Sequence, residues 1–267
     1  MATPITLRSY FGYQRHPFPP ACAPEPLFRY EALETTLRQA HHALANRLHL
    51  LVSAPAGLGK SCFCRLLLGE LNPRDFRPVY LVGQPLGVPD LLRAIAEPLG
   101  LESSPRKGTA ARLLTDGLEK LAAAGPQPLA VIDEADQIPL DGLDFLRRLA
   151  ERPDRTLLSL VLVATDTFAR LLARPALAPL AGRLPVRLRL APLSLDEAAA
   201  FIAHAFTAVG MNDLLAPAAL PALYTASGGS PRRLGCLLAA ALERAYQKRS
   251  KLLTDEIIQE ILDADIP

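Results

Sequence analysis

A short apolar run, a glycine-containing loop and a helical pattern follow one another within residues 48–71, and this order constrains the fold most. Residues 48–52 form the apolar run, and apolar side chains at helical spacing continue from Phe63 to Leu71. Between them lies Ala-Pro-Ala-Gly-Leu-Gly-Lys-Ser, residues 54–61. Glycines let backbone N–H groups curl around phosphate oxygens, and the helix that follows presents its positive end. The segment therefore predicts a phosphate-binding loop between a strand and a helix.

Each residue type in this loop suits nucleotide chemistry. Lys60 is expected to reach the β- and γ-phosphates, and the Ser61 hydroxyl is expected to bind magnesium. The usual pattern is G-x-x-x-x-G-K-[ST], and Ala54 stands where the first glycine is expected. We expect a small residue to suffice there, although a fortuitous glycine turn is the alternative for the loop taken alone. The predicted nucleotide-binding residues are Ala54, Pro55, Ala56, Gly57, Leu58, Gly59, Lys60, Ser61 and Cys62.

Further apolar runs alternate with helical patterns up to residue 190, after which the strands stop. The runs cover 79–82, 129–132, 157–164 and 186–190, and helical patterns cover 30–46, 88–99, 107–124, 140–151 and 166–182. Continuous apolar strands alternating with helices are typical of a parallel sheet covered on both faces. Residues 194–209, 216–227, 231–248 and 254–264 are all helical in pattern. We predict a three-layer α/β core over residues 30–191 and a small all-helical domain over residues 192–267.

Residues 1–29 form a segment rich in prolines and aromatic side chains, including Tyr10-Phe11-Gly12 and Pro17-Phe18-Pro19-Pro20. Prolines deny a long helix, and the aromatic rings need a surface to pack on. We expect an ordered arm that packs on the α/β core.

Composition excludes some classes of protein and leaves others open. Of 267 residues, 50% are hydrophobic, which is enough for a sizeable core. No apolar run approaches the roughly 18 residues that span a bilayer, and the first residues do not resemble a signal peptide. We expect a soluble cytoplasmic protein without a membrane partner. The net charge of +2 forces no partner either, so any nucleic-acid surface must come from local clusters of basic residues.

A second motif ends the apolar run 129–132 with two adjacent carboxylates, Asp133 and Glu134. Asp133 is expected to hold magnesium, directly or through water. Glu134 is expected to polarise the water that attacks the γ-phosphate, as a general base. Taken alone, an acidic pair at a strand end is often an ordinary solvated loop. Some 70 residues after the phosphate-binding loop, the pair instead indicates a magnesium-dependent ATP hydrolase.

Three further residues are candidates for the same site. Thr165, after the run 157–164, is expected beside the γ-phosphate, or else caps the helical segment that follows. Arg183, near the end of the core, could compensate transition-state charge from a neighbouring subunit, or be a solvated charge. Pro231 suits a first helical position, which would aim Arg232 towards the nucleotide unless it is a surface charge at a helix start.

This order of parts resembles that of the AAA+ ATPases, a group of P-loop NTPases, and more narrowly of the ExeA-type group. The likeness covers nearly the whole chain. It includes the aromatic opening, Val131-Ile132-Asp133-Glu134-Ala135 and Gly229-Ser230-Pro231-Arg232-Arg233-Leu234. The resemblance implies that Arg183 is the arginine finger, that Arg232 is the second sensor and that the helical domain is a lid. It places Thr165 at the first-sensor position, where many ExeA-type chains have glutamine.

ExeA-type ATPases occur in two settings, which imply different partners. One is the secretion ATPase, in which a membrane span and a cell-wall-binding region follow the ATPase domain. The other is the stand-alone transposition regulator similar to TnsC, TniB and MuB, which forms ATP-dependent rings or filaments on duplex DNA and presents it to a transposase. Because this chain ends at Pro267, we expect the second setting, with secretion assembly on protein partners as the alternative.

A DNA-binding surface needs cationic or hydroxyl side chains that contact phosphates without reading sequence. Two stretches supply candidates, although a solvated helix face is the simpler reading of each. The predicted DNA contacts are Arg106, Lys107, Thr109, Arg147 and Arg152, with Arg148 and Arg155 in the same clusters.

Overall fold

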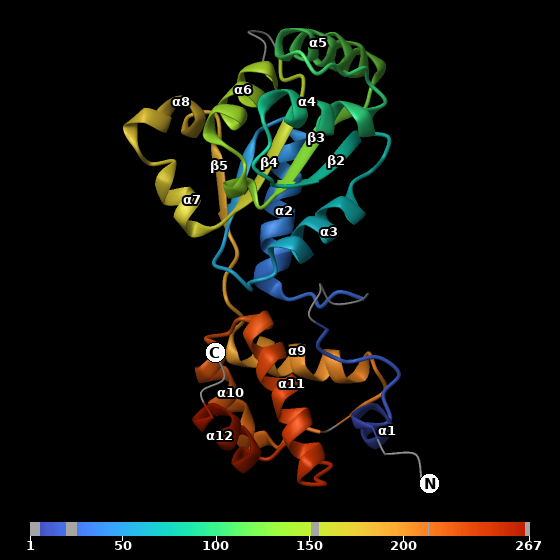
Figure 1. Ribbon diagram of the computed structural model, residues 1–267, viewed down its shortest axis with the longest axis vertical. Coiled ribbons are helices and arrows are strands. Elements are labelled where there is room, and N and C mark those ends of the chain that lie inside the picture. Colours follow the sequence, from blue (N-terminus) through green and yellow to red (C-terminus); the bar gives the residue numbers. More distant parts are fainter. Residues whose placement is uncertain (1–5, 20–25, 151–154, 213, 265–267) are drawn as a thin grey trace. The chain divides into compact units, whose positions relative to one another are not determined.

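The computed structural model describes residues 6–19, 26–150, 155–212 and 214–264, which form two compact units (Figure 1). One comprises Glu31–Ala56 and Lys60–Leu190 and is called the α/β unit below. The other comprises Met1–Tyr30, Gly57–Gly59 and Ala191–Pro267 and is called the helical unit.

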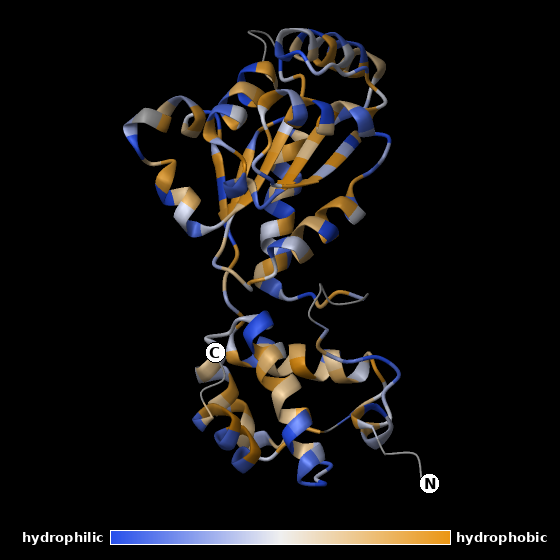
Figure 2. Ribbon diagram, in the orientation of Figure 1, coloured by the Kyte–Doolittle hydropathy of each residue, from blue (hydrophilic) through white to orange (hydrophobic). Residues whose placement is uncertain are grey.

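A five-stranded sheet forms the centre of the α/β unit, and each pair of neighbouring strands is parallel. The strand order is β2-β3-β4-β1-β5. The strands are β1 (Leu50–Ser53), β2 (Phe76–Val82), β3 (Gln127–Asp133), β4 (Ser159–Ala164) and β5 (Val186–Arg189). The three inner strands β1, β3 and β4 are buried throughout, whereas the edge strands are partly exposed. Figure 2 shows the inner strands as largely hydrophobic. The parallel pairing of all neighbouring strands confirms the predicted parallel sheet.

Helices cover both faces of this sheet, as predicted. Successive strand residues point to opposite faces. Leu51, Ile132 and Leu162 share one hydrophobic core with residues of α4, α5 and α6, while α2 and α3 contact each other and the sheet. The helices are α2 (Glu31–Ala45), α3 (Lys60–Glu70), α4 (Val88–Ala96), α5 (Lys107–Ala124), α6 (Leu140–Ala150), α7 (Asp166–Leu171) and α8 (Ala178–Ala181). Short 3-10 turns lie at η1 (Glu97–Leu99), η2 (Ala135–Gln137) and η3 (Pro175–Leu177).

The strand register brings the carboxyl ends of the inner strands to one edge of the sheet. Ser53 of β1 lies opposite Ala164 of β4 on one side and Arg189 of β5 on the other. Ile132 of β3 lies opposite Leu162 of β4. In open parallel sheets, ligands bind in the crevice at this edge, where the strand order reverses. In this sheet the reversal falls at β1, directly before the glycine loop.

The helical unit contains the four predicted helices, α9 (Leu195–Thr207), α10 (Leu220–Ser227), α11 (Pro231–Gln247) and α12 (Asp255–Asp263), with a short η4 (Pro217–Ala219). Ser194 and Glu197 form a capping box at the start of α9, and Ser230 caps α11 directly before Pro231. Within the residues that the structure describes, no helix of either unit is both long and apolar enough to cross a membrane.

The described residues of the N-terminal arm, 6–19 and 26–29, pack in the helical unit, so the prediction that the arm packs on the α/β core is wrong. Its helix α1 (Leu7–Phe11) contacts α11, and the Tyr10 and Tyr246 rings lie 5.4 Å apart. Phe18 meets Phe206 of α9 edge to face at 5.5 Å, and Phe28 meets Phe201 at 5.6 Å. Edge-to-face pairs of this kind are favourable beyond the area they bury. The receiving rings belong to α9 and α11, whose sequences alone do not indicate that they take up the arm.

Candidate functional site

The predicted phosphate-binding loop lies between β1 and α3, as expected. Gly57 and Gly59 have φ values of 85° and 83°, in the left-handed region that glycine adopts without steric cost. Arg47, Glu134 and Arg249 are the non-glycine residues with positive φ in the described chain. Ala54 is therefore in an ordinary backbone conformation; it is fully buried, and its N–H donates to the Ala164 carbonyl at 3.2 Å. This geometry explains why alanine fits where the usual pattern has glycine.

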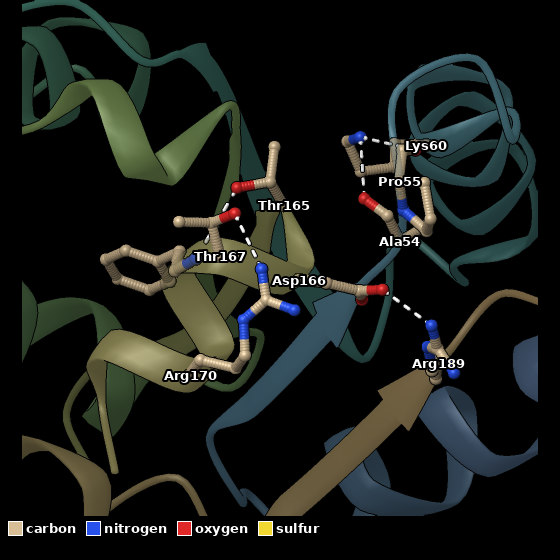
Figure 3. Close-up of polar contacts among 9 residues, drawn as sticks. Ala54, Pro55, Lys60, Thr165, Asp166, Thr167, Arg170 and Arg189 are labelled. Carbon is tan, nitrogen blue, oxygen red and sulfur yellow. Dashed lines mark hydrogen bonds and ion pairs between the residues drawn. The ribbon is translucent and has the colours of Figure 1, made fainter. Parts of the chain in front are cut away.

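The side chain of Lys60 folds back towards Ala54 and Pro55, the first residues of this loop (Figure 3). Its ammonium group donates to the carbonyl oxygens of Ala54 and Pro55, both at 3.0 Å. Lys60 is the first residue of α3, where the helix leaves backbone N–H groups without helical partners. Ser61 is exposed next to it, and Cys62 is half-buried. The Lys60 cation and the N–H groups of the first helical turn thus meet at one end of α3, an arrangement that suits an anion.

The acidic pair lies at the end of β3 and combines a buried with an exposed carboxylate. Asp133 is 2% exposed; its Oδ1 accepts the Glu134 N–H at 2.9 Å, and its Oδ2 accepts the Tyr80 hydroxyl at 3.2 Å. Glu134 is exposed, with φ 52° and ψ 41°. The structure therefore holds one carboxylate rigidly and presents the other to solvent.

Thr165 follows β4 and caps α7. Its hydroxyl accepts the Phe168 N–H at 3.4 Å and donates to Asp136 Oδ2, also at 3.4 Å. The capping role left open from sequence is therefore present, while its role as a sensor stays a prediction. Thr165 nonetheless ends the strand between β1 and β3, so the order of the sheet brings it to the same edge as Ala54 and Asp133.

An ion pair that the sequence did not indicate lies beside the loop (Figure 3). Arg189, the last residue of β5, contacts Asp166 with Nη2 and Oδ2 2.6 Å apart. The hydrogen bond from Arg189 holds the pKa of Asp166 below its usual value, against the opposing effect of burial; the positive charges of Arg189 and Arg170 and a Ser53 hydrogen bond lower it further. The pair connects the ends of β4 and β5 across the end of β1, because Ser53 lies between those strands.

Arg183 and Arg232, the predicted arginine finger and second sensor, lie on different elements of the chain. Arg183 is exposed in the turn between α8 and β5 of the α/β unit. Arg232 is exposed in the first turn of α11, and its N–H donates at 3.2 Å to the carbonyl of Gly57, which is also grouped with the helical unit. The finger and sensor roles of these side chains stay predictions.

The two clusters of predicted DNA contacts converge on one surface formed by α5 and α6. Lys107 Nζ lies 4.7 Å from the centre of the Phe145 ring, and Arg148 Cζ lies 5.9 Å from it. Arg106 directly precedes Lys107 and is exposed. We call Arg106, Lys107, Phe145 and Arg148 the basic–aromatic patch.

The remaining candidates contribute less to this surface. Asp144 pairs with both Arg147, at 3.0 Å, and Arg148, at 3.1 Å. The two arginines differ in exposure, because the Arg147 side chain is 13% exposed whereas that of Arg148 is 62% exposed. Thr109 is half-buried in the first turn of α5. Arg152 lies outside the described residues.

Comparison with known proteins agrees with this fold. Residues 43–172, which contain the loop, the acidic pair and Thr165, match the family model described as an AAA domain. A curated relative, the General secretion pathway protein A of Aeromonas hydrophila, is 29% identical over 247 residues, which cover 90% of this chain and 45% of the relative. The chain thus spans less than half the length of that relative.

Solved structures show the same fold at low sequence identity. Cdc6p of Pyrobaculum aerophilum is 20% identical with a TM-score of 0.71, over 89% of this chain and 67% of that one. The ORC1 protein of Aeropyrum pernix, solved in complex with DNA, is 21% identical with a TM-score of 0.62, over 86% and 64% of the two chains. The RuvB Holliday junction branch migration motor of Thermotoga maritima is 19% identical with a TM-score of 0.61, over 94% and 73%.

Proposed function

We propose that this chain, which is an AAA-domain P-loop ATPase, assembles on duplex DNA when ATP is bound and regulates transposition by recruiting or activating a transposase there. The observation that carries the proposal is that one chain holds both a candidate nucleotide site at the strand ends and the basic–aromatic patch on α5 and α6. In this proposal, ATP bound at the strand-end site promotes DNA binding by the patch, and the patch contacts DNA phosphates without reading base sequence.

In the proposed reaction, the backbone N–H groups of residues 56–62 bind the phosphates of ATP, and Lys60 stabilises the charge on the β- and γ-phosphates. Lys60 would exchange the carbonyl oxygens of Ala54 and Pro55 for phosphate oxygens. Glu134 orients the attacking water and accepts its proton, which its exposed position permits. Thr165 contacts the γ-phosphate. Arg183 of a neighbouring subunit and Arg232 keep the finger and second-sensor roles that the resemblance implies.

Magnesium fits the donor atoms of this site. Among the described residues, no group of three or more His, Cys, Asp or Glu could hold a metal ion. Magnesium does not need one, because one or two protein oxygens together with substrate phosphates and waters are its usual ligands. Buried Asp133 and the exposed Ser61 hydroxyl would supply the protein oxygens. The bound ion would neutralise charge on the β- and γ-phosphates.

The proposed DNA surface makes phosphate contacts through Arg106, Lys107 and Arg148, with Phe145 packing against two of these cations. Its support is the convergence of residues about forty positions apart on one exposed surface. A relative of this fold, the ORC1 protein of Aeropyrum pernix, was solved with DNA, which favours the same class of ligand here.

A sedimentation experiment tests the proposal. The chain is mixed with duplex DNA of mixed sequence at low salt, with no nucleotide, with ADP, or with a slowly hydrolysed ATP analogue and magnesium. We expect co-sedimentation with the analogue alone, in complexes that hold many copies per duplex and dissociate as salt rises. Failure to sediment with DNA at low salt in the presence of the analogue would contradict the DNA-binding role.

One observation favours a second candidate, an assembly ATPase that acts on protein partners of a secretion system. This observation is the 29% identity to the General secretion pathway protein A of Aeromonas hydrophila. On this alternative the ATP analogue drives oligomers of the same size with and without DNA. Sedimentation velocity in the absence of DNA therefore distinguishes the two candidates.

A further inference from the structure

We propose that Gly83, directly after β2, is a positioning residue that sets the backbone conformation of Glu134 and so aims its carboxylate for hydrolysis. This inference rests on the proposed role of Glu134 as general base. Gly83 lies 51 positions before Glu134 and is no part of the phosphate-binding loop or the acidic pair.

Glu134 occupies a backbone conformation that its residue type rarely adopts. Its φ of 52° and ψ of 41° lie in the left-handed region, where a side chain is crowded by its own backbone. Glycine is the usual residue at such a position. A glutamate held there at the end of a strand suggests that the carboxylate is needed for function, since such strain persists only where surrounding structure enforces it.

Backbone contacts enforce this conformation from both sides. The Glu134 carbonyl accepts the N–H of Gln137 at 2.9 Å, which closes the turn η2. The preceding carbonyl, of Asp133, accepts the N–H of Gly83 at 2.7 Å, and Asp133 lies opposite Val82 in the β2–β3 register. The chain at Asp133 and Glu134 is therefore fixed against β2.

The contact between Gly83 and Glu134 leaves no room for a side chain. A Cβ atom on residue 83 would lie 2.0 Å from the Glu134 carbonyl oxygen and 2.8 Å from its carbonyl carbon. Gly83 is not among the glycines with positive φ, so alanine could adopt its backbone conformation. The obstacle to alanine is thus the contact itself. One added methyl group would displace the Glu134 peptide and turn the carboxylate away.

Gly83→Ala tests the inference, with Gly69→Ala as the matched control because a Cβ at Gly69 meets no atom within 4 Å. We expect Gly83→Ala to bind ATP with magnesium within about twofold of wild-type affinity but to turn over about 100-fold more slowly, since a misplacement of about 1 Å can cost that much. Gly69→Ala is expected to match the wild type in both measurements. Unchanged turnover in Gly83→Ala, or equal losses of binding and turnover, would overturn the inference.

The double variant separates positioning from general damage. With Glu134→Gln as the background, Gly83→Ala is expected to slow the residual turnover by less than about twofold, because the group it positions is already absent. An undiminished 100-fold loss in that background would refute the positioning role. If Glu134→Gln alone left turnover unchanged, the proposed base would be wrong, and this result is distinct from a failure of the inference.

A second pair of variants tests the conformation even if Gly83→Ala does not fold. Glu134→Gly and Glu134→Ala both lack the carboxylate, but only glycine relieves the strain of the left-handed backbone. We expect Glu134→Gly to melt about 2 °C or more above Glu134→Ala. Equal melting temperatures would mean that residue 134 is not held in this conformation, and the inference would fail.

Discussion

The strand-end site and the basic–aromatic patch are built in opposite ways. The site rests on buried strands and on backbone with defined φ values, from Gly57 and Gly59 to Glu134. The patch rests on three exposed cations at the start of α5 and on α6, two of which contact the half-buried ring of Phe145. Chemistry on phosphate needs groups fixed to fractions of an ångström, whereas contacts to a DNA backbone need only positive charge in reach.

This difference predicts that substitutions in the site and in the patch affect different properties, ATP turnover in the first case and DNA binding in the second. A change in the site should abolish turnover through geometry, and a change in the patch should weaken DNA binding in proportion to the charge removed. The first three predictions below test the separation from its strongest consequence to its weakest.

Lys60→Ala should have the most severe effect, because it removes the ammonium group that lies over the carbonyls of Ala54 and Pro55. We expect turnover to fall about 100- to 1,000-fold, in the range seen when one donor to developing charge is lost. Steady-state phosphate release with magnesium measures it, and circular dichroism checks the fold. Turnover within tenfold of the wild type would break the assignment of this loop as the catalytic phosphate site.

Arg106→Ala with Lys107→Ala should weaken DNA binding and leave turnover without DNA intact. Each phosphate contact contributes about 0.9 to the dependence of log affinity on log salt, so the slope should fall by about 2. Binding to a labelled duplex at several salt concentrations gives the slope.

Arg38→Ala is the control for this pair, since Arg38 is exposed on α2, away from the patch. If the slope of log affinity against log salt did not change in the double variant, or changed equally in Arg38→Ala, the assignment of the patch as the DNA-binding surface would be wrong.

Asp166→Asn should have the mildest effect, because Arg189, its partner in the ion pair, is 69% exposed. The lowered pKa of Asp166 means that the pair stabilises the fold above the unfolded-state value of about 3.9, and that this contribution is lost as pH falls through the folded-state value. The melting temperature of the wild type should exceed that of the variant at pH 7, and the gap should close at acid pH. A gap that stays constant from pH 7 to pH 3 would contradict the assigned contribution.

Sequence periodicity was sufficient for most of the fold, because the inner strands are buried on both faces and therefore continuously apolar. The loop and the acidic pair were predictable for a similar reason: each is contiguous in sequence and placed by a single strand. The position of Thr165 follows from the same logic.

Contacts that depend on register were not predictable. The Tyr80 hydroxyl reaches Asp133 from 53 positions away, and Gly83 meets Glu134 only because β2 pairs with β3 in one register. The packing of the N-terminal arm was predicted wrongly for a comparable reason. The sequence shows that the arm carries aromatic side chains, but it does not show which other rings they pack against. The patch required the packing of α5 on α6 before its two basic clusters could be recognised as one surface.

The central claim is that the acidic pair at the end of β3 drives ATP hydrolysis. The ATP turnover rate of the Glu134→Gln variant tests this claim most directly. The measurement is phosphate release at saturating ATP and magnesium, with nucleotide affinity determined in parallel. The account predicts a loss of about 100-fold or more in turnover, the range of a general base, with affinity kept within about twofold. Turnover equal to that of the wild type would contradict it.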